Sequence, residues 1–301
     1  MAVLRKGLGA GRKRSPRRTF PPGLRALGLL LICFILAVPL PACGNVLAGP
    51  HILELMVQAL SSAQSLRVEQ TVVVEDKAIA DHPLELTETL SYAFPDRYRS
   101  DTHYKETERI HVVAQGQTLT VIDGQRTADA TGRFDRYKDL LLYRSRPMLL
   151  KILLSHGMDV GKTSLGRSDD RIVYVIGAQY PDMSGSQVWV DKERFLPMRW
   201  LLVSSTDPND RLEFVYSDWQ KKGDLWYPLQ VETFHNQILI RRIRVTQIQV
   251  NASLAPDLFD IPRLMDTYPQ AASAGTSPPP DSDSSQEVQQ TIEEFRKKFG
   301  D

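Results

Sequence analysis

Apolar and polar side chains alternate with a period of two along much of the chain between residues 66 and 250. In the run 84–94, Thr87, Thr89 and Ser91 fall on one side, and only Glu88 interrupts the other, apolar side. Successive side chains of a strand point to opposite faces of a sheet, so this period predicts a strand. The apolar side of the run consists of Leu84, Leu86, Leu90, Tyr92 and Phe94. Similar strands are predicted at 68–75, 97–104, 109–114 and 117–123.

The same alternation resumes after Gly166 and gives five further sets of apolar side chains that share a face. These sets are Ile172, Tyr174 and Ile176; Val188 and Val190; Met198, Trp200 and Leu202; Leu212, Phe214 and Tyr216; and Leu225, Tyr227, Leu229 and Val231. In the last long strand, 238–250, the apolar parity shifts between Val245 and Ile248, which predicts a bulge or a bend.

Two segments have a helical pattern instead. Residues 52–65 place apolar side chains on one helical face. The segment 135–160 is rich in leucine, and Pro147 divides it into two short helices. These segments are the candidates for helices that pack on the apolar side of the strands.

The connections between strands are short and polar, as in DPND and DKERFLP, which favours antiparallel pairing. One apolar face per strand indicates a sheet with one covered side and one wet side. We therefore predict a mainly β (α+β) fold. A single domain, 51–265, holds one large curved antiparallel sheet of ten or eleven strands, with helices on its concave face.

The N-terminus has the composition of an export signal. The first 25 residues carry eight Lys or Arg and no acid, and the 17 apolar residues 26–42 follow. A helix of that length spans roughly 26 Å, slightly less than the roughly 30 Å hydrocarbon core of a bilayer. Pro39 and Pro41 would also break its last turn. We predict a signal peptide over 1–42, with an uncleaved signal anchor as the alternative.

The residues Leu40–Cys43, LPAC, resemble the lipobox of bacterial lipoproteins, although Pro41 stands where a small or β-branched residue is more usual. The resemblance implies lipidation of Cys43 and a tether over 43–50. Because two or more acyl chains hold a protein durably on a bilayer, the mature chain would be a membrane-anchored domain in the periplasm. Gly44 differs from the aspartate of an inner-membrane retention signal, which favours the outer membrane.

Removal of residues 1–42 changes the charge of the chain. Lys plus Arg falls from 37 to 29 while Asp plus Glu stays at 36, so the mature net charge is −7. A nucleic-acid partner would require a basic face, which this composition does not favour. The two cysteines are Cys33, in the apolar run, and Cys43. The mature fold therefore has no disulfide and no Cys metal ligand.

The C-terminal part changes composition again. Residues 266–286 are rich in Pro, Ser and Ala and are predicted to be a disordered linker. Residues 287–301 follow as an amphipathic tail helix, with Val288, Ile292, Phe295 and Phe299 on one face. This helix either packs on its own domain or docks to a protein partner through 287–299.

No motif for catalysis is present among the nucleophile-elbow, zincin, P-loop and dinucleotide-binding patterns, so we predict no enzyme and no cofactor. A tight turn centred at Thr107 would place His103 and His111 across a hairpin from each other. A stable metal site requires three or four ligands, however, and no third ligand is identifiable. We predict no metal site.

Over residues 51–262 the chain resembles the periplasmic lipoprotein-carrier superfamily, which has the Lol-type fold. The resemblance lies in the hairpin QVWVDKERFLPMRW, 187–200, and in the segments DLWYPLQVETF and NASLAPDLFDIP. It implies a half-barrel of about eleven strands that helices close over an apolar cavity for acyl chains. A freely diffusing carrier would lack an anchor, so the lipobox favours an acceptor or a lipid-handling lipoprotein.

We therefore predict a periplasmic lipoprotein that binds the acyl chains of a lipid or lipoprotein, in sorting or transfer. The alternative is an envelope-stress sensor or scaffold of the same fold that signals to a protein partner. For each residue below, plain core packing is the competing interpretation. The predicted cavity residues are Leu86, Leu90, Tyr92, Phe94, Tyr174, Ile176, Val188, Val190, Met198, Trp200, Leu202, Phe214, Tyr216, Tyr227 and Leu229, and the lid residues are Leu140, Leu141, Leu149, Leu150 and Leu153.

Overall fold

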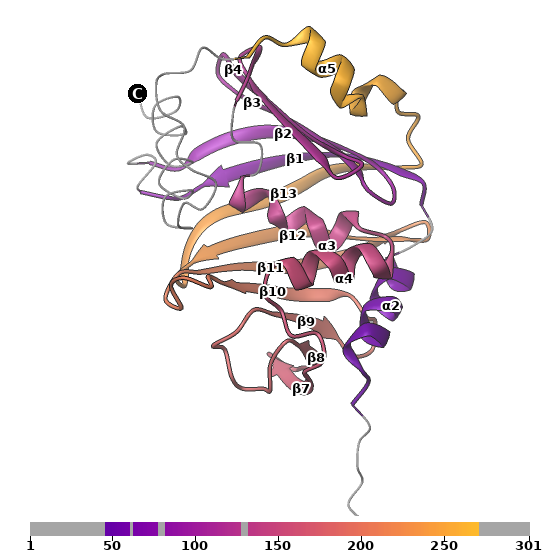
Figure 1. The fold of residues 1–301 in the computed structure, drawn as a ribbon, viewed down its shortest axis with the longest axis vertical. Coiled ribbons are helices and arrows are strands. Elements are labelled where there is room, and N and C mark those ends of the chain that lie inside the picture. Colours follow the sequence, from indigo (N-terminus) through magenta and orange to yellow (C-terminus); the bar gives the residue numbers. More distant parts are fainter. Residues whose placement is uncertain (1–45, 61–62, 78–81, 128–131, 271–301) are drawn as a thin grey trace, which may run out of the picture. The chain divides into compact units, whose positions relative to one another are not determined.

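The computed structural model describes residues 46–60, 63–77, 82–127 and 132–270, and the proposed signal peptide and tail helix lie outside these ranges. The described residues form one antiparallel sheet of thirteen strands, in the order β6-β5-β4-β3-β2-β1-β13-β12-β11-β10-β9-β8-β7 (Figure 1). The strands are β1 (Ser65–Val74), β2 (Leu84–Ala93), β3 (Arg97–Tyr104), β4 (Thr107–Ala114), β5 (Gln117–Ile122), β6 (Gln125–Arg126), β7 (Thr163–Ser168), β8 (Arg171–Ile176), β9 (Gln187–Asp191), β10 (Pro197–Val203), β11 (Arg211–Lys222), β12 (Leu225–His235) and β13 (Ile238–Val250).

The order of the strands shows two meanders that meet at β1 and β13. The first meander runs outward from β1 to β6, and the second runs inward from β7 to β13. Antiparallel pairing of β1 with β13 joins the two meanders into one sheet. The prediction of a single antiparallel sheet is confirmed, with thirteen strands rather than ten or eleven.

Helices cover one face of this sheet, which we call the inner face. They are α2 (Gly49–Leu60), the 3-10 helix η1 (Arg133–Lys138), α3 (Asp139–Leu142) and α4 (Arg146–Ser155). Pro147 lies in the first turn of α4, where its missing N–H costs nothing. Figure 1 shows α3 and α4 lying over β11 and β12, and α2 packs against α4 and β12. We call η1, α3 and α4 together the roof.

The opposite, outer face has its own smaller cover. The 3-10 helix η2 (Pro256–Phe259) and α5 (Ile261–Thr267) place Phe259 and Ile261 against buried side chains of β4 and β5. A second outer cluster joins β8 and β9, where Trp189 packs with Val173 and Val175. The inner face is therefore covered by helices, and the outer face has a cover over β4 and β5 and a second buried cluster at β8 and β9.

A bulge in β13 confirms the predicted change of parity. Glu69 of β1 pairs with Gln247, but the next residue, Gln70, pairs with Val245. Thr246 is the extra residue, and its hydroxyl donates a hydrogen bond of 2.9 Å to the carbonyl of Glu69. The bulge lets both halves of β13 keep their apolar side chains on the inner face.

A second irregularity makes one prediction wrong. The register between β9 and β10 shifts between Pro197 and Arg199, so Met198 does not share a face with Trp200. Met198 packs on the outer cluster of β8 and β9 instead.

The hairpin between β3 and β4 also differs from the prediction. Its turn lies at Lys105 and Glu106, because Tyr104 pairs with Thr107. His103 therefore faces Glu108, and His111 faces Ser100. The two histidines are not brought together, and the described residues contain no group of three or more His, Cys, Asp or Glu that could hold a metal.

Candidate ligand site on the inner face of the sheet

The structure gathers most of the predicted cavity residues into one buried cluster. Its members share an inward position on the strands and are nearly or fully buried. They are Leu86, Leu90, Tyr92, Tyr174, Ile176, Val188, Val190, Trp200, Leu202, Phe214, Tyr216 and Tyr227. Phe94 is partly buried and packs against the same cluster. Met198 lies on the outer face, and Leu229 is half-buried outside the cluster.

The predicted lid residues complete this cluster from the roof. Leu140 and Leu141 come from α3, and Leu149 and Leu153 from α4, and each is 0% exposed. Leu150 is partly buried and packs against the same core. The leucines of the roof therefore cover the inner face of the sheet in this closed arrangement.

Aromatic rings line the part of the inner face near the start of β12. Tyr92 packs edge-on against Tyr98 and Tyr227 and stacks on Phe94. The hydroxyls of Tyr92 and Tyr227 form a hydrogen bond of 3.1 Å. Burial is the main cause that raises the pKa of both hydroxyls, so they stay protonated and can act as donors at neutral pH.

A charged cluster lies beside this apolar surface. Glu88 accepts hydrogen bonds from Gln70, Ser100 and Thr102, and Arg241 lies 3.6 Å from its carboxylate. Its side chain is 1% exposed. A buried carboxylate needs partners that replace its water, and these four side chains are its partners. The position of Glu88 in the alternating pattern was the one sequence signal of this cluster.

The cluster continues into η1 through Asp135. Its carboxylate accepts a hydrogen bond from Arg109 and lies 3.4 Å from Arg241. Burial alone would raise the pKa of Asp135, but Arg109, Arg241 and Lys138 hold it well below its usual range. Asp135 is thus ionised at neutral pH and fixes η1 to the sheet.

His111 borders the same cluster from β4. Its Nδ1 lies 3.0 Å from the hydroxyl of Thr120. Burial, followed by the charge of Arg109, lowers the pKa of His111 to about 3, so the ring is neutral at physiological pH. It is a buried polar group of the core.

The other side of η1 is fixed by a second ionic contact. The guanidinium of Arg133 donates two hydrogen bonds, of 2.7 and 2.8 Å, to the carboxylate of Asp210. His235 Nε2 lies 2.9 Å from the same carboxylate. The hydroxyl of Tyr216 donates to the carbonyl of Tyr137 at 2.7 Å. Both sides of η1 are therefore bonded to the sheet.

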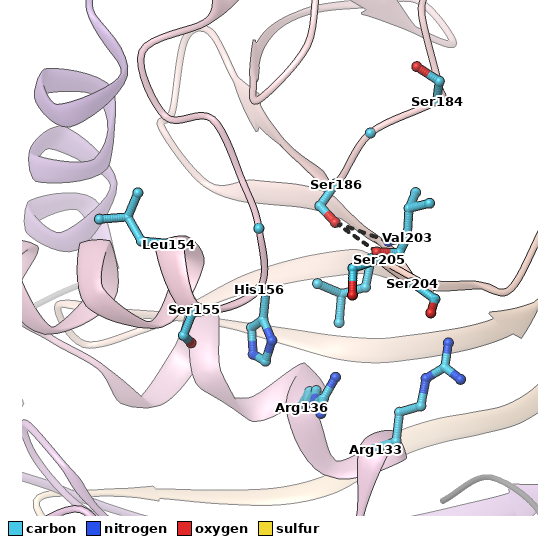
Figure 2. Close-up of a pocket in the computed structure, with 13 residues that line it drawn as sticks. Arg133, Arg136, Leu154, Ser155, His156, Ser184, Ser186, Val203, Ser204 and Ser205 are labelled. Carbon is cyan, nitrogen blue, oxygen red and sulfur yellow. Dashed lines mark hydrogen bonds between the residues drawn. The ribbon is translucent and has the colours of Figure 1, made fainter. Parts of the chain in front are cut away.

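A polar pocket of about 570 Å³ opens where α4 ends. Figure 2 shows Arg133 and Arg136 of η1 beside it, with His156 and the serines of the loops 184–186 and 204–205 around it. Burial is the main cause that lowers the pKa of His156 to about 4. This pocket borders Leu202 of the apolar cluster, and its polar lining was not foreseen from the sequence.

Among the residues that the structure describes, no helix combines the length and apolarity needed to cross a bilayer.

Sequence comparison gives no assignment, because no family model and no curated protein matches the chain. Solved structures do match. A domain from Vibrio parahaemolyticus named for outer membrane lipoprotein sorting is 11% identical, with a TM-score of 0.50, over 72% of this chain and 97% of that one. A DUF1329 family protein from Desulfovibrio piger is 14% identical, also with a TM-score of 0.50, over 72% of this chain and 98% of that one.

A LolA superfamily protein from Nitrosomonas europaea is 11% identical, with a TM-score of 0.44, over 72% of this chain and 99% of that one. At these identities the first two matches establish a shared fold. The chain has the Lol-type fold, an open curved antiparallel sheet with helices on its inner face.

Proposed function

We propose that this chain is an exported lipoprotein that binds acyl chains of a lipid or lipoprotein on the inner face of its sheet. Lipidation of Cys43 would hold it at the periplasmic side of a membrane, with the outer membrane favoured. Its role would be sorting or transfer of the bound molecule, by binding rather than by catalysis. The support is the fold, which it shares with a domain named for lipoprotein sorting.

The observation that carries the proposal is the composition of the contact between roof and sheet. The apolar side chains that α3 and α4 bury there are leucines, and they meet aliphatic and aromatic side chains of the strands. An acyl chain gains about 0.8 kcal/mol per buried CH₂ group. It can therefore replace the leucines of the roof on the sheet without any new hydrogen bond.

The two ends of the roof are held with different strength. Buried ion pairs hold η1 to the sheet through Asp135 and Arg133. The ion pair of α4, between Arg146 and Glu54, is half-exposed, and such pairs contribute about 0–1 kcal/mol. We infer that α4 moves away to admit a ligand while η1 stays in place.

The test uses fatty acids brominated at different positions along the chain, because bromine quenches tryptophan fluorescence on contact. Of the four tryptophans, Trp200 is fully buried on the inner face, Trp219 and Trp226 are partly buried against the same cluster, and Trp189 belongs to the outer cluster. We expect saturable quenching in the full-length protein. The triple variant Trp200→Phe, Trp219→Phe, Trp226→Phe, which keeps only Trp189, should lose this quenching, and Trp189→Phe should retain it. Absence of saturable quenching, together with absence of lipid in mass spectra of protein purified from membranes, would contradict the proposal.

A further inference from the structure

Arg144 has a buried guanidinium to which no described residue supplies a hydrogen-bond or ion-pair partner. It lies in the link between α3 and α4, and its backbone N–H donates to the carbonyl of Pro95 at 3.4 Å. Its guanidinium carbon lies 4.5 Å from the centre of the Phe94 ring. Nε, Nη1 and Nη2 are all buried, and none of them has a hydrogen-bond partner among the described residues.

The cation–π contact with Phe94 does not satisfy this guanidinium. Its five N–H donors need acceptors, and the ring supplies none of the oxygen acceptors that a carboxylate would. Burial lowers the pKa of Arg144 to about 10, so the group still carries its charge at neutral pH. A buried charge without a partner is unfavourable and marks a candidate functional residue.

The other buried arginines of the inner face have carboxylate partners. Arg109 pairs with Asp135, Arg133 pairs with Asp210, and Arg241 lies near both Glu88 and Asp135. In these three cases the fold supplies an acid to an arginine that holds elements together. Arg144 differs from all three.

The groups near Arg144 are donors rather than acids. Tyr92 stacks on the same Phe94 ring over which Arg144 lies, and its hydroxyl is bonded to that of Tyr227. The guanidinium and the two phenolic hydroxyls supply N–H and O–H donors to the same aromatic part of the inner face. This set is complementary to an oxyanion, since arginine binds carboxylate and phosphate with two parallel hydrogen bonds.

We propose that Arg144 binds the anionic group of an amphiphilic ligand, a carboxylate or a phosphate, whose acyl chain lies on the inner face of the sheet. This inference rests on the proposed function and narrows its ligand to acidic amphiphiles. No acidic side chain of the described residues pairs with Arg144, because the anionic group of the ligand takes that place. Tyr92 and Tyr227 would donate to the same anion once their mutual hydrogen bond opens.

The test compares ligands that share an acyl chain and differ in whether their head group is charged. A fluorescent fatty acid and its methyl ester form one pair, and an acyl glycerol phosphate and the uncharged acyl glycerol form the other. We expect the full-length protein to bind the acid of at least one pair about tenfold more tightly than its neutral counterpart. The pair that shows this preference tells whether the anion is a carboxylate or a phosphate.

The variant Arg144→Met should lose that preference and keep the affinity for the neutral ligand. Arg144→Lys should retain part of it, because the charge remains while the planar fork is lost. Arg167→Met, at an exposed position of β7 away from the roof, removes the same charge; it is the control and should bind like the wild type. Two results would overturn the inference. One is an equal loss of affinity for the acid and for the neutral ligand in Arg144→Met, and the other is a wild type that does not prefer the acid.

Thermal unfolding of protein freed of lipid gives a second measurement. Replacing an unpartnered buried charge by an apolar side chain of similar length removes a desolvation cost, so Arg144→Met should raise the melting temperature. A fall in melting temperature would show that the cation stabilises the closed roof and would overturn the inference. If the neutral ligands do not bind either, the proposed function itself fails. If they bind without any effect of charge, only the role of Arg144 fails.

Discussion

Single residues of the inner face show how much of the site depends on buried charge. Glu88 stands out in the sequence because it interrupts an apolar alternation, and the structure places it among four polar partners. We expect Glu88→Gln to lower the free energy of unfolding by about 3–5 kcal/mol, because Arg241 loses one of its carboxylates in a buried site. Urea unfolding measures this change. Glu85→Gln, at an exposed position of the same strand, should stay within about 0.5 kcal/mol of the wild type.

His111 predicts a pH dependence of stability. Its folded pKa of about 3 lies below the unfolded value of 6.5, so the unfolded chain binds the extra proton between these two pH values. Stability should therefore fall as pH falls from 6.5 toward 3, by about 1.4 kcal/mol per pH unit for this group. The change His111→Asn should make this fall less steep in urea unfolding between pH 6.5 and 4. His103→Asn, at an exposed site, should leave it unchanged, and equal slopes for all three proteins would count against the prediction.

At the scale of elements, the sequence pattern predicted the position of strands better than it predicted which residues pair with each other. The alternation located most strands, and the change of parity near Val245 located the bulge, because both are properties of consecutive residues. Met198 was misplaced because the register shift beside it depends on how β9 pairs with β10. Asp135 and Arg241 could not be linked to Glu88 from the sequence, since 47 to 153 residues separate them along the chain. No sequence pattern indicated that Arg144 is buried, because its burial depends on how the roof packs on the sheet.

The bulge in β13 gives a prediction about register. Deletion of Thr246 would force one half of the strand to shift by one residue and to exchange its inner and outer side chains. We expect this variant to lose cooperative thermal unfolding monitored by circular dichroism. Thr246→Ala keeps the residue count and loses only the hydrogen bond to Glu69, so it should cost about 0.5–1.5 kcal/mol. A deletion variant as stable as Thr246→Ala would show that the register tolerates the shift.

At the scale of the whole molecule, the ends of the domain meet in the middle of its sheet. β1 follows α2, β13 is the last strand, and the two pair along their length. The segment after β13 then crosses to the outer face, where η2 and α5 cover β4 and β5, and Arg126 donates to the carbonyl of Pro269.

Two truncated chains distinguish the contribution of this cover to stability from that of the proposed tail helix. A chain that ends at Gln270 should keep the melting temperature and the acyl-chain binding of the full protein. A chain that ends at Ala255 removes Phe259 and Ile261 and exposes apolar side chains of two strands, so it should melt at a lower temperature. If the shorter chain were as stable as the longer one, the outer cluster would contribute little to the fold.

The proposed anchor makes a prediction for the intact protein in its cell. If Cys43 is lipidated, growth with an alkyne-tagged fatty acid should label the chain, and its mass should correspond to the loss of residues 1–42 and the gain of acyl chains. Cys43→Ser should lose both the label and the cleavage, whereas Cys33→Ser, in the same apolar run, should retain both. An unlabelled chain of full mass in the wild type would instead support the uncleaved signal anchor. The distinction bears on function, because a lipid anchor keeps the inner face near a bilayer. There a ligand can pass between membrane and sheet without crossing water.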